Sequence, residues 1–130
     1  MPDPALVTAY EAATLAVTFP SGIATFDRTG QRTGEPITSP FGAITAWNPS
    51  GKPRSLQENE AAQSELAADI EAARWQGYPA VSYDPSGAHR EPQFAIIGAP
   101  AAELLALARK YRQAAHFWWD GLSLTIVWCD

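Results

Sequence analysis

The chain of 130 residues has the length of one globular domain. Apolar residues make up 46% of it and charged residues only 18%, and its five Trp, five Phe and four Tyr exclude intrinsic disorder. The net charge of -5 argues against a protein that binds nucleic acid through phosphate contacts, and a single Cys excludes an internal disulfide. We therefore expect a single domain over residues 1–130, made of an N-terminal part (1–40) and a core (41–130).

Signals for targeting or membrane insertion are not apparent in the sequence. Residues 1–4 show neither the basic nor the apolar region of a signal peptide. Charged or turn-forming residues interrupt every apolar run well before the roughly 18 residues that a membrane span needs. We expect a soluble, cytoplasmic protein that has no membrane partner.

The N-terminal part is predicted to contain one helix and one hairpin. Asp3 can cap a short helix that has Pro4 at its first position. Residues 14–19 and 23–27 are predicted strands, joined by a Pro-Ser-Gly turn. Residues 28–40 are rich in Gly, Thr and Pro, which predicts a loop.

The core begins with a buried strand and the longest helix of the chain. Residues 41–48 are mostly apolar without clean alternation, which predicts a strand buried on both faces. Ser55 and Glu58 form the pattern of a capping box, so the helix should begin there. Gly77 is placed to end it.

The rest of the core is predicted to be a hairpin, a helix and a second hairpin. Residues 80–83 and 93–98 flank a strong turn sequence, and Pro100 can begin the helix. Residues 114–119 and 122–128 are the last strands, joined by a two-residue Asp-Gly turn.

That turn predicts the register of the last hairpin. The core side would pair Trp119 with Leu122, Phe117 with Leu124, and Ala115 with Ile126. The opposite face would be solvated or covered by the N-terminal helix. It would carry His116, Trp118, Ser123 and Thr125.

The order of elements predicts an α+β fold. Residues 41–119 run strand, helix, strand, strand, helix, strand, which is the ferredoxin-like split βαβ arrangement. We expect an antiparallel sheet with helices mainly on one face, an N-terminal helix and hairpin before it and one extra strand after it. In this topology the polar residues at the strand ends meet at one edge of the sheet. They are Trp47, Asn48, Asn59, Asp84, His89, Glu91 and Gln113.

Six short segments resemble one known family. They are residues 10–12 (YEA), 44–49 (ITAWNP), 58–61 (ENEA), 84–87 (DPSG), 90–92 (REP) and 113–115 (QAA). The resemblance is to the bacterial family catalogued as domain of unknown function 3293, and it covers most of the chain after about residue 8, apart from residues 20–40. Because no activity, substrate or cofactor is known for that family, the resemblance implies none.

Three positions depart from the pattern of that family. His89 stands where we expect Trp, Gln93 where we expect a small hydroxyl residue, and Ala114 where we expect Asn. The first departure weakens an essential role for His89. The stronger site candidates are Asn48, Asn59, Asp84 and Glu91.

The two asparagines each have a structural and a functional interpretation. Asn48 can direct its amide at a ligand or close the strand end as a turn residue. Asn59 can bond to the loop of Asn48 or Asp84, or help an anion to bind near the helix N-terminus. Trp47 beside them is predicted to contribute packing more than ligand stacking.

Asp84, His89 and Glu91 are three titratable residues on one predicted loop. They could form an acid/base pair with an orienting group, or a weak metal site together with His116. Their spacing matches no established metal motif, so no metal and no cofactor is predicted.

Residues 50–55 (SGKPRS) lack the spacing of a phosphate-binding loop, because Pro53 stands where Ser or Thr is required. Lys52 and Arg54 could attract one small anion, although a solvated turn is the better explanation.

The sequence predicts a place for function more clearly than a function. The leading hypothesis is a domain that binds a small ligand or a protein partner through Trp47, Asn48, Asn59, Asp84, His89 and Glu91. One alternative is an enzyme in which Asp84 or Glu91 is the general acid/base and His89 the second titrating group. Another is a protein-interaction module or homodimer that uses the face of His116 and Trp118.

Overall fold

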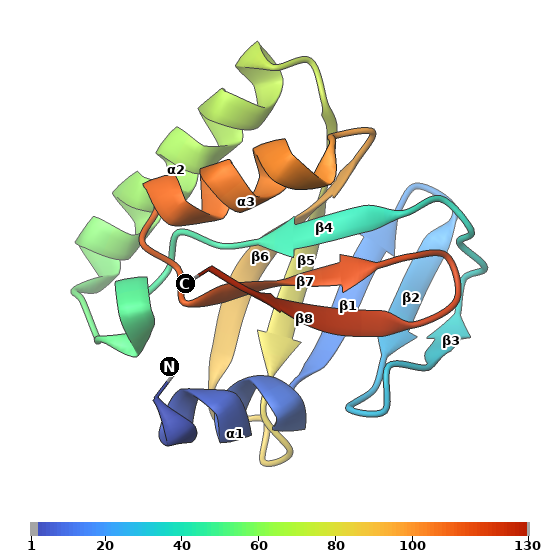
Figure 1. Cartoon of the computed structure of the whole chain (residues 1–130), viewed down its shortest axis with the longest axis horizontal. Helices are drawn as coiled ribbons and strands as arrows, with labels where there is room; N and C mark the ends of the chain where they lie inside the picture. The colour runs from blue at the N-terminus through green and yellow to red at the C-terminus, as the bar shows by residue number, and fades with distance from the viewer. Residues whose placement is uncertain (1–2, 130) are drawn as a thin grey trace.

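The computed structural model describes residues 3–129, which form an α+β fold with an eight-stranded antiparallel sheet (Figure 1). Met1, Pro2 and Asp130 lie outside the described residues. The elements are, in chain order, α1 (Pro4–Ala12), β1 (Thr14–Phe19), β2 (Gly22–Phe26), β3 (Arg32–Gly34), β4 (Phe41–Ile44), the 3-10 helix η1 (Pro49–Gly51), α2 (Leu56–Ala72), β5 (Gln76–Tyr83), β6 (Arg90–Ile97), α3 (Ala101–Lys110), β7 (Ala115–Trp119) and β8 (Leu124–Trp128). None of the described helices has the length and apolar character that crossing a membrane requires.

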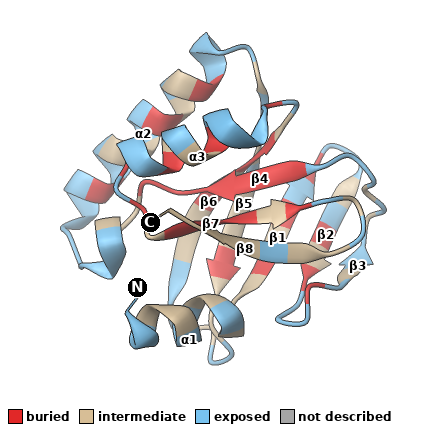
Figure 2. Cartoon of the chain, in the orientation of Figure 1, coloured by how far each residue is buried: buried red, intermediate tan, exposed pale blue. Residues whose placement is uncertain are grey.

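The strands are ordered β3-β2-β1-β5-β6-β4-β7-β8, and every neighbouring pair is antiparallel. β4 therefore lies inside the sheet, between β6 and β7. It is buried along its whole length, as the sequence predicted, and Figure 2 shows it as the most continuous buried strand of this view.

The sheet is strongly curled. Four strands separate β2 from β7, so the two would lie about 24 Å apart in a flat sheet. The rings of Phe26 on β2 and Trp119 on β7 are nevertheless only 4.9 Å apart between centroids. The Leu124 N–H also donates to the Gly30 carbonyl across the same opening, at 2.9 Å. The sheet thus bends until its two ends nearly meet.

Two apolar clusters lie on opposite faces of this sheet, because neighbouring residues of a strand point to opposite sides. Ala43 and Ala95 belong to the inner cluster, which fills the concave side together with Phe26, Phe41 and Trp119. Ile44 and Ile96, the next residues along, belong to the outer cluster with side chains of both α2 and α3.

The helices begin at the predicted residues. The Asp3 carboxylate accepts the Ala5 N–H at 2.8 Å. Ser55 and Glu58 form the predicted capping box, in which the Ser55 hydroxyl accepts the Glu58 N–H at 3.1 Å. Pro100 is the cap residue before α3.

The end of α2 was predicted wrongly. The helix ends at Ala72, and Arg74 takes the left-handed conformation (φ 61°) that the sequence assigned to Gly77. Gly77 lies within β5 instead, where a Cβ atom would come 3.1 Å from the Ile70 side chain. Its missing side chain allows α2 to pack closely on the sheet. The predicted 28–40 loop also contains the short strand β3.

The register of the last hairpin differs from the prediction by two residues. Trp119 pairs with Leu124 and Phe117 with Ile126, so a four-residue loop replaces the predicted two-residue turn. The cause is Asp120, whose carboxylate accepts the N–H groups of both Leu122 and Ser123. A shift of two residues preserves which face each strand residue occupies. Leu122, predicted to be in the core, is 88% exposed.

The face of His116 and Trp118 is not covered by α1, and it is solvated only in part, since Thr125 on it is exposed. His116 is only 3% exposed, and Trp118 packs against the outer cluster, to which α2 and α3 contribute. Tyr10 of α1 packs against the inner cluster instead.

We predict that the contact between Phe26 and Trp119 is a major source of stability. Phe26→Ala should lower the free energy of unfolding by about 3–5 kcal/mol, because it removes a fully buried ring from the closing point of the curl. Urea unfolding followed by Trp fluorescence measures the loss. Ile23→Ala, on the same strand but 57% exposed, is the control and should change it by less than about 0.5 kcal/mol. Equal effects of the two variants would contradict the closure of the sheet.

Candidate functional site

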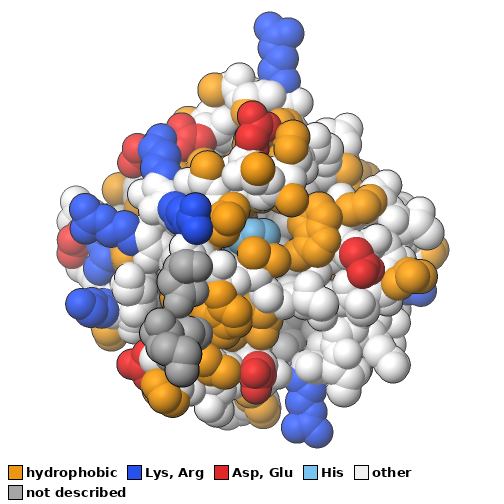
Figure 3. Space-filling model, in the orientation of Figure 1, with side chains coloured by type: hydrophobic (Ala, Val, Ile, Leu, Met, Phe, Trp, Pro, Cys, Tyr) orange, Lys and Arg blue, Asp and Glu red, His pale blue; other side chains and the backbone are white. Residues whose placement is uncertain are grey.

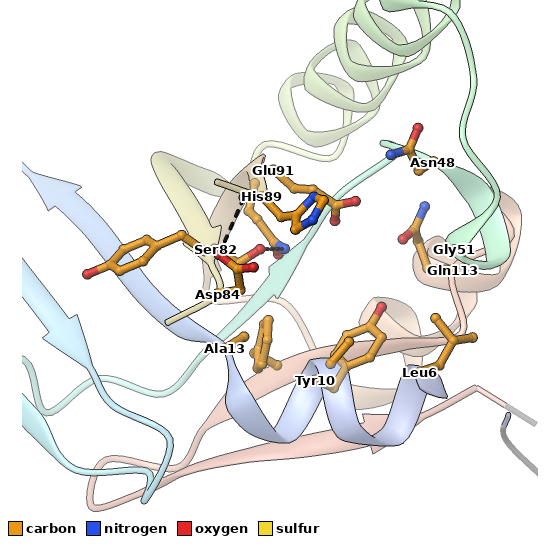
Figure 4. A pocket seen from close by; sticks show the side chains of 14 residues that line it. Leu6, Tyr10, Ala13, Asn48, Gly51, Ser82, Asp84, His89, Glu91 and Gln113 are labelled. Atoms are coloured by element: carbon orange, nitrogen blue, oxygen red, sulfur yellow. Dashed lines mark hydrogen bonds between the residues drawn. The ribbon is translucent and has the colours of Figure 1, made fainter. Parts of the chain in front are cut away.

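A cavity of about 170 Å³ lies where the ends of β5 and β6 meet α1 and the loop after β4 (Figure 4). We call it the strand-end cavity. One wall is apolar and comes from α1 and β7, and the other is polar and comes from the strand ends. The cavity is lined by Leu6, Ala9, Tyr10, Ala13, Asn48, Gly51, Ser82, Tyr83, Asp84, His89, Glu91, Gln93, Gln113 and Phe117.

Glu91 is the charged group at the centre of the polar wall. It lies opposite Ser82 in the β5–β6 pair, on the concave side of the sheet. Burial raises the pKa of its carboxyl group, while a hydrogen bond with the Asn48 side chain and the nearby His89 act in the opposite direction. Among the described residues, no Lys or Arg lines the cavity or forms an ion pair with Glu91. Its negative charge therefore lacks a Lys or Arg partner among residues 3–129.

Asn48 and Asn59 are joined by two hydrogen bonds. The Asn48 N–H donates to Asn59 Oδ1 at 2.9 Å, and Asn59 Nδ2 donates to Asn48 Oδ1 at 2.8 Å. Asn59 is only 2% exposed and does not line the cavity, which favours its structural interpretation. The pair holds Asn48 in a left-handed conformation (φ 42°), with its side chain beside Glu91.

Asp84 and His89 form the rim of the cavity and stabilise the hairpin turn. Asp84 Oδ1 accepts the Ser86 hydroxyl at 2.9 Å and the His89 N–H at 3.4 Å. The hydrogen bond from Ser86 lowers the pKa of Asp84, so this carboxylate is a poor general base. The His89 side chain is exposed. Of the two predicted acid/base candidates, Glu91 has the better environment.

α1 forms the apolar wall of the cavity, a role that the sequence did not indicate. Leu6 packs so closely on η1 that a Cβ atom at Gly51 would lie 2.5 Å from it. The Tyr10 hydroxyl donates to the Ala115 carbonyl at 3.3 Å, and its ring lies 5.6 Å from that of Phe117. Burial and then the charge of Glu91 raise the pKa of Tyr10 above its usual range.

Trp47 and His116 lie outside the cavity. Trp47 lines a separate surface pocket beside α2, and its carbonyl accepts a hydrogen bond from Gln113 Nε2 at 3.2 Å. His116 is buried in the sheet with Nδ1 2.9 Å from the Phe117 carbonyl, and burial lowers its pKa. Within residues 3–129, no three His, Cys, Asp or Glu side chains are grouped so that they could hold a metal ion. His116 thus does not join Asp84, His89 and Glu91.

The residues that the sequence placed at one edge are therefore divided into three groups. Asn48, Asp84, His89, Glu91 and Gln113 line the cavity together. Asn59 supports them from behind, and Trp47 faces elsewhere.

We predict that the Asn48–Asn59 pair supports the fold. Asn59→Ala should lower the free energy of unfolding by about 1–3 kcal/mol, because it leaves the half-buried Asn48 N–H without its acceptor. Chemical denaturation measures the change. Gln57→Ala, at an exposed position of the same helix, is the matched control and should have little effect. The prediction fails if the two variants are equally stable.

We also predict that Glu91 makes stability depend on pH. Because its pKa is raised in the folded protein, the folded state holds this proton more tightly than the unfolded state. The protonated Glu91 carboxyl therefore stabilises the folded state at pH values below 4.5, the ordinary pKa of Glu. This stabilisation is lost as the pH rises through the higher pKa of the folded protein. Glu91→Gln, which cannot ionise, should therefore have a higher Tm than the parent protein at pH 8, and this difference should shrink toward pH 4.

Thermal unfolding at several pH values tests this, with the exposed Glu60→Gln as control. A Glu91→Gln variant that is less stable than the control at pH 8 would contradict a destabilising buried charge.

Comparison with known families gives one match. The model of the family described as "Protein of unknown function (DUF3293)" matches residues 44–115, which include Asn48, Asn59, Asp84 and Glu91. No curated protein and no solved structure matches the chain. Since the match covers more than half of its residues, the chain belongs to the DUF3293 family.

Proposed function

We propose that this protein binds a small organic molecule in the strand-end cavity, and that the molecule presents a cationic group to Glu91. The observation that carries the proposal is a half-buried carboxylate, with its pKa raised by burial, facing a cavity that no described Lys or Arg lines. A ligand ammonium or guanidinium group would supply the missing charge, and an ion pair formed away from water is stronger than one on the surface.

The walls of the cavity define the size and shape of such a ligand. A volume of about 170 Å³ is below the usual range for drug-sized ligands, so it suits a compact molecule of a few heavy atoms. Leu6 on α1, Ala13 directly after that helix and Phe117 on β7 offer an apolar surface for a short hydrocarbon part. The Gln113 side-chain oxygen can accept a hydrogen bond from the head group. Asn48 Oδ1 cannot, because it already accepts from the Arg54 N–H and from Asn59 Nδ2. A short alkylamine or alkylguanidine combines these features.

A second candidate function is acid/base catalysis by Glu91. A raised carboxyl pKa brings the group closer to neutral pH, where a general acid or base works best. His89 and the Tyr10 hydroxyl, which both interact electrostatically with Glu91, are the candidates for the second group. Asp84 has no part in this candidate function, because its pKa is lowered and one of its oxygens stabilises the turn. Turnover of a bound ligand, followed by NMR, separates an enzyme from a binding protein.

We further propose that residues 41–119 form a ferredoxin-like split βαβ unit within a single domain. The strand order β5-β6-β4-β7, with α2 and α3 as the two crossovers, supports this interpretation. α2 and α3 share the outer cluster, which supports their placement on one face. The N-terminal hairpin and β3 extend the sheet beyond β5, and β8 extends it beyond β7.

The binding proposal predicts a selective thermal shift. Short alkylamines or alkylguanidines should raise the Tm, and carboxylic acids of the same chain length should not. A ligand at 100 times its Kd adds about 2.7 kcal/mol to the free energy of unfolding, a shift of several degrees. Glu91→Gln should lose the shift although it remains folded, whereas Glu60→Gln should keep it. Stabilisation by the acids, or an undiminished shift in Glu91→Gln, would overturn the proposal.

A further inference from the structure

A second hollow of about 620 Å³ lies on another part of the surface, between η1 and the start of α2 on one side and the end of α3 on the other. We call it the basic groove. Lys52 and Arg54 line it from the first side, and Lys110 and Arg112 from the second. Its floor includes Tyr111, which is only 8% exposed. Its volume lies within the usual range for ligand pockets.

The groove concentrates positive charge in an acidic protein. The chain has nine Lys and Arg and a net charge of -5, yet four of the nine line this one hollow. Figure 3 shows Lys and Arg side chains gathered at the side of the molecule where η1, the start of α2 and the end of α3 lie. Glu58 and Glu65 also line the groove, which leaves an excess of positive charge.

Two of the four cations are not neutralised by any residue within 3–129. Lys110 forms an ion pair with Asp69 at 2.7 Å, and Arg54 a longer one with Glu58 at 3.7 Å. The side chains of Lys52 and Arg112 form no hydrogen bond or ion pair with any other described residue. Two free cations, carried by two different elements, therefore border one hollow.

The backbone beneath these two cations is fixed in a strained conformation. The Ser50 N–H and hydroxyl both donate to the Arg112 carbonyl, at 2.8 and 3.1 Å, and so join η1 to the end of α3. Ser50 (φ 56°) and Arg112 (φ 55°) both adopt the left-handed conformation, which is unfavourable for residues other than Gly. This joint holds the segments that carry Lys52 and Arg112 at a constant separation.

We propose that the basic groove binds a small phosphorylated ligand carrying at least two negative charges. Guanidinium and ammonium groups are the side chains that recognise phosphate, the first by paired hydrogen bonds and the second as a point charge. The N-terminus of α2 is not the binding element, because Ser55 and Glu58 already cap it. A phosphate group would instead lie between Lys52 and Arg112. This site is separate from the strand-end cavity, whose central charge is negative.

Isothermal titration with pyrophosphate at low and at high salt tests the proposal. The informative variant is Arg112→Gly, because Gly adopts the left-handed conformation without strain, so the change removes the charge while favouring the fold. Arg74→Gly is its matched control. Arg74 is also an exposed, left-handed Arg after a helix, but it does not line the groove.

The two variants should differ clearly. We expect Arg112→Gly, and likewise Lys52→Gln, to weaken pyrophosphate binding at least 10-fold, and Arg74→Gly to weaken it less than 2-fold. Binding to the parent protein should also weaken as salt increases. Glu91→Gln should bind pyrophosphate as the parent protein does, so this test is independent of the proposed function of the cavity.

Several results would overturn the proposal. One is equal loss in Arg112→Gly and Arg74→Gly, which would indicate a general effect of charge. Another is the absence of pyrophosphate binding at millimolar concentration. A third is that a short poly-glutamate peptide binds at least as tightly as pyrophosphate and that the same groove variants abolish its binding. That result would identify an acidic peptide as the ligand class.

Discussion

The curl of the eight-stranded sheet is the constraint on which the other features depend. Phe26 and Trp119 can touch only because the sheet bends through the four strands between them. The bend creates a concave face with enough depth for the inner cluster, and aromatic rings in tilted or edge contact fill it. It also leaves room at one end, where α1 closes over the strand ends of β5 and β6. The strand-end cavity is thus the part of the concave side that the aromatic side chains do not fill.

Local signals in the sequence predicted most of the elements. Asp3, Ser55 with Glu58, and Pro100 each mark a helix start by a contact within a few residues, and the structure has a helix after each. The errors arose where two local signals competed. Asp120-Gly121 has the composition of a two-residue turn, but the Asp120 carboxylate binds two later N–H groups and enlarges the loop. A Gly such as Gly77 can end a helix, or it can let a helix pack closely on a strand. Gly77 has the second role, because it lies in β5 beneath Ile70 of α2.

The curl itself could not be predicted, because the alternation of residues indicates which face is buried but not how far the sheet bends. The same limit applies to the candidate site. Asn48, Glu91 and Gln113 were placed together correctly because strand order alone brings strand ends to one edge. Tyr10 was missed because its position depends on where α1 packs, and nothing within that helix indicates the face of the sheet that it covers. The sequence pointed to Lys52 and Arg54 but not to the groove that they border, because the other two cations of the groove, Lys110 and Arg112, are far from them along the chain.

The loop between β4 and α2 borders both hollows. Asn48 and Gly51 line the strand-end cavity, whereas Ser50, Lys52 and Arg54 line the basic groove. The hydrogen bonds of Asn48 to Asn59 and of Ser50 to Arg112 fix this loop from two sides. A short segment in which Asn48, Ser50 and Gly51 are left-handed therefore separates an acidic site from a basic one.

The near-closure of the sheet also affects its exposed edges. An open sheet presents two rows of unpaired backbone groups, and strands of other chains can add to them. In this protein β3 is only three residues long, and the Leu124 N–H at the start of β8 is bonded to Gly30, beside the opposite edge. The edge formed by β3 is thus short, and the edge formed by β8 has one backbone N–H already bonded to a residue next to β3. The bend that builds the aromatic core also reduces the backbone available for edge-to-edge aggregation.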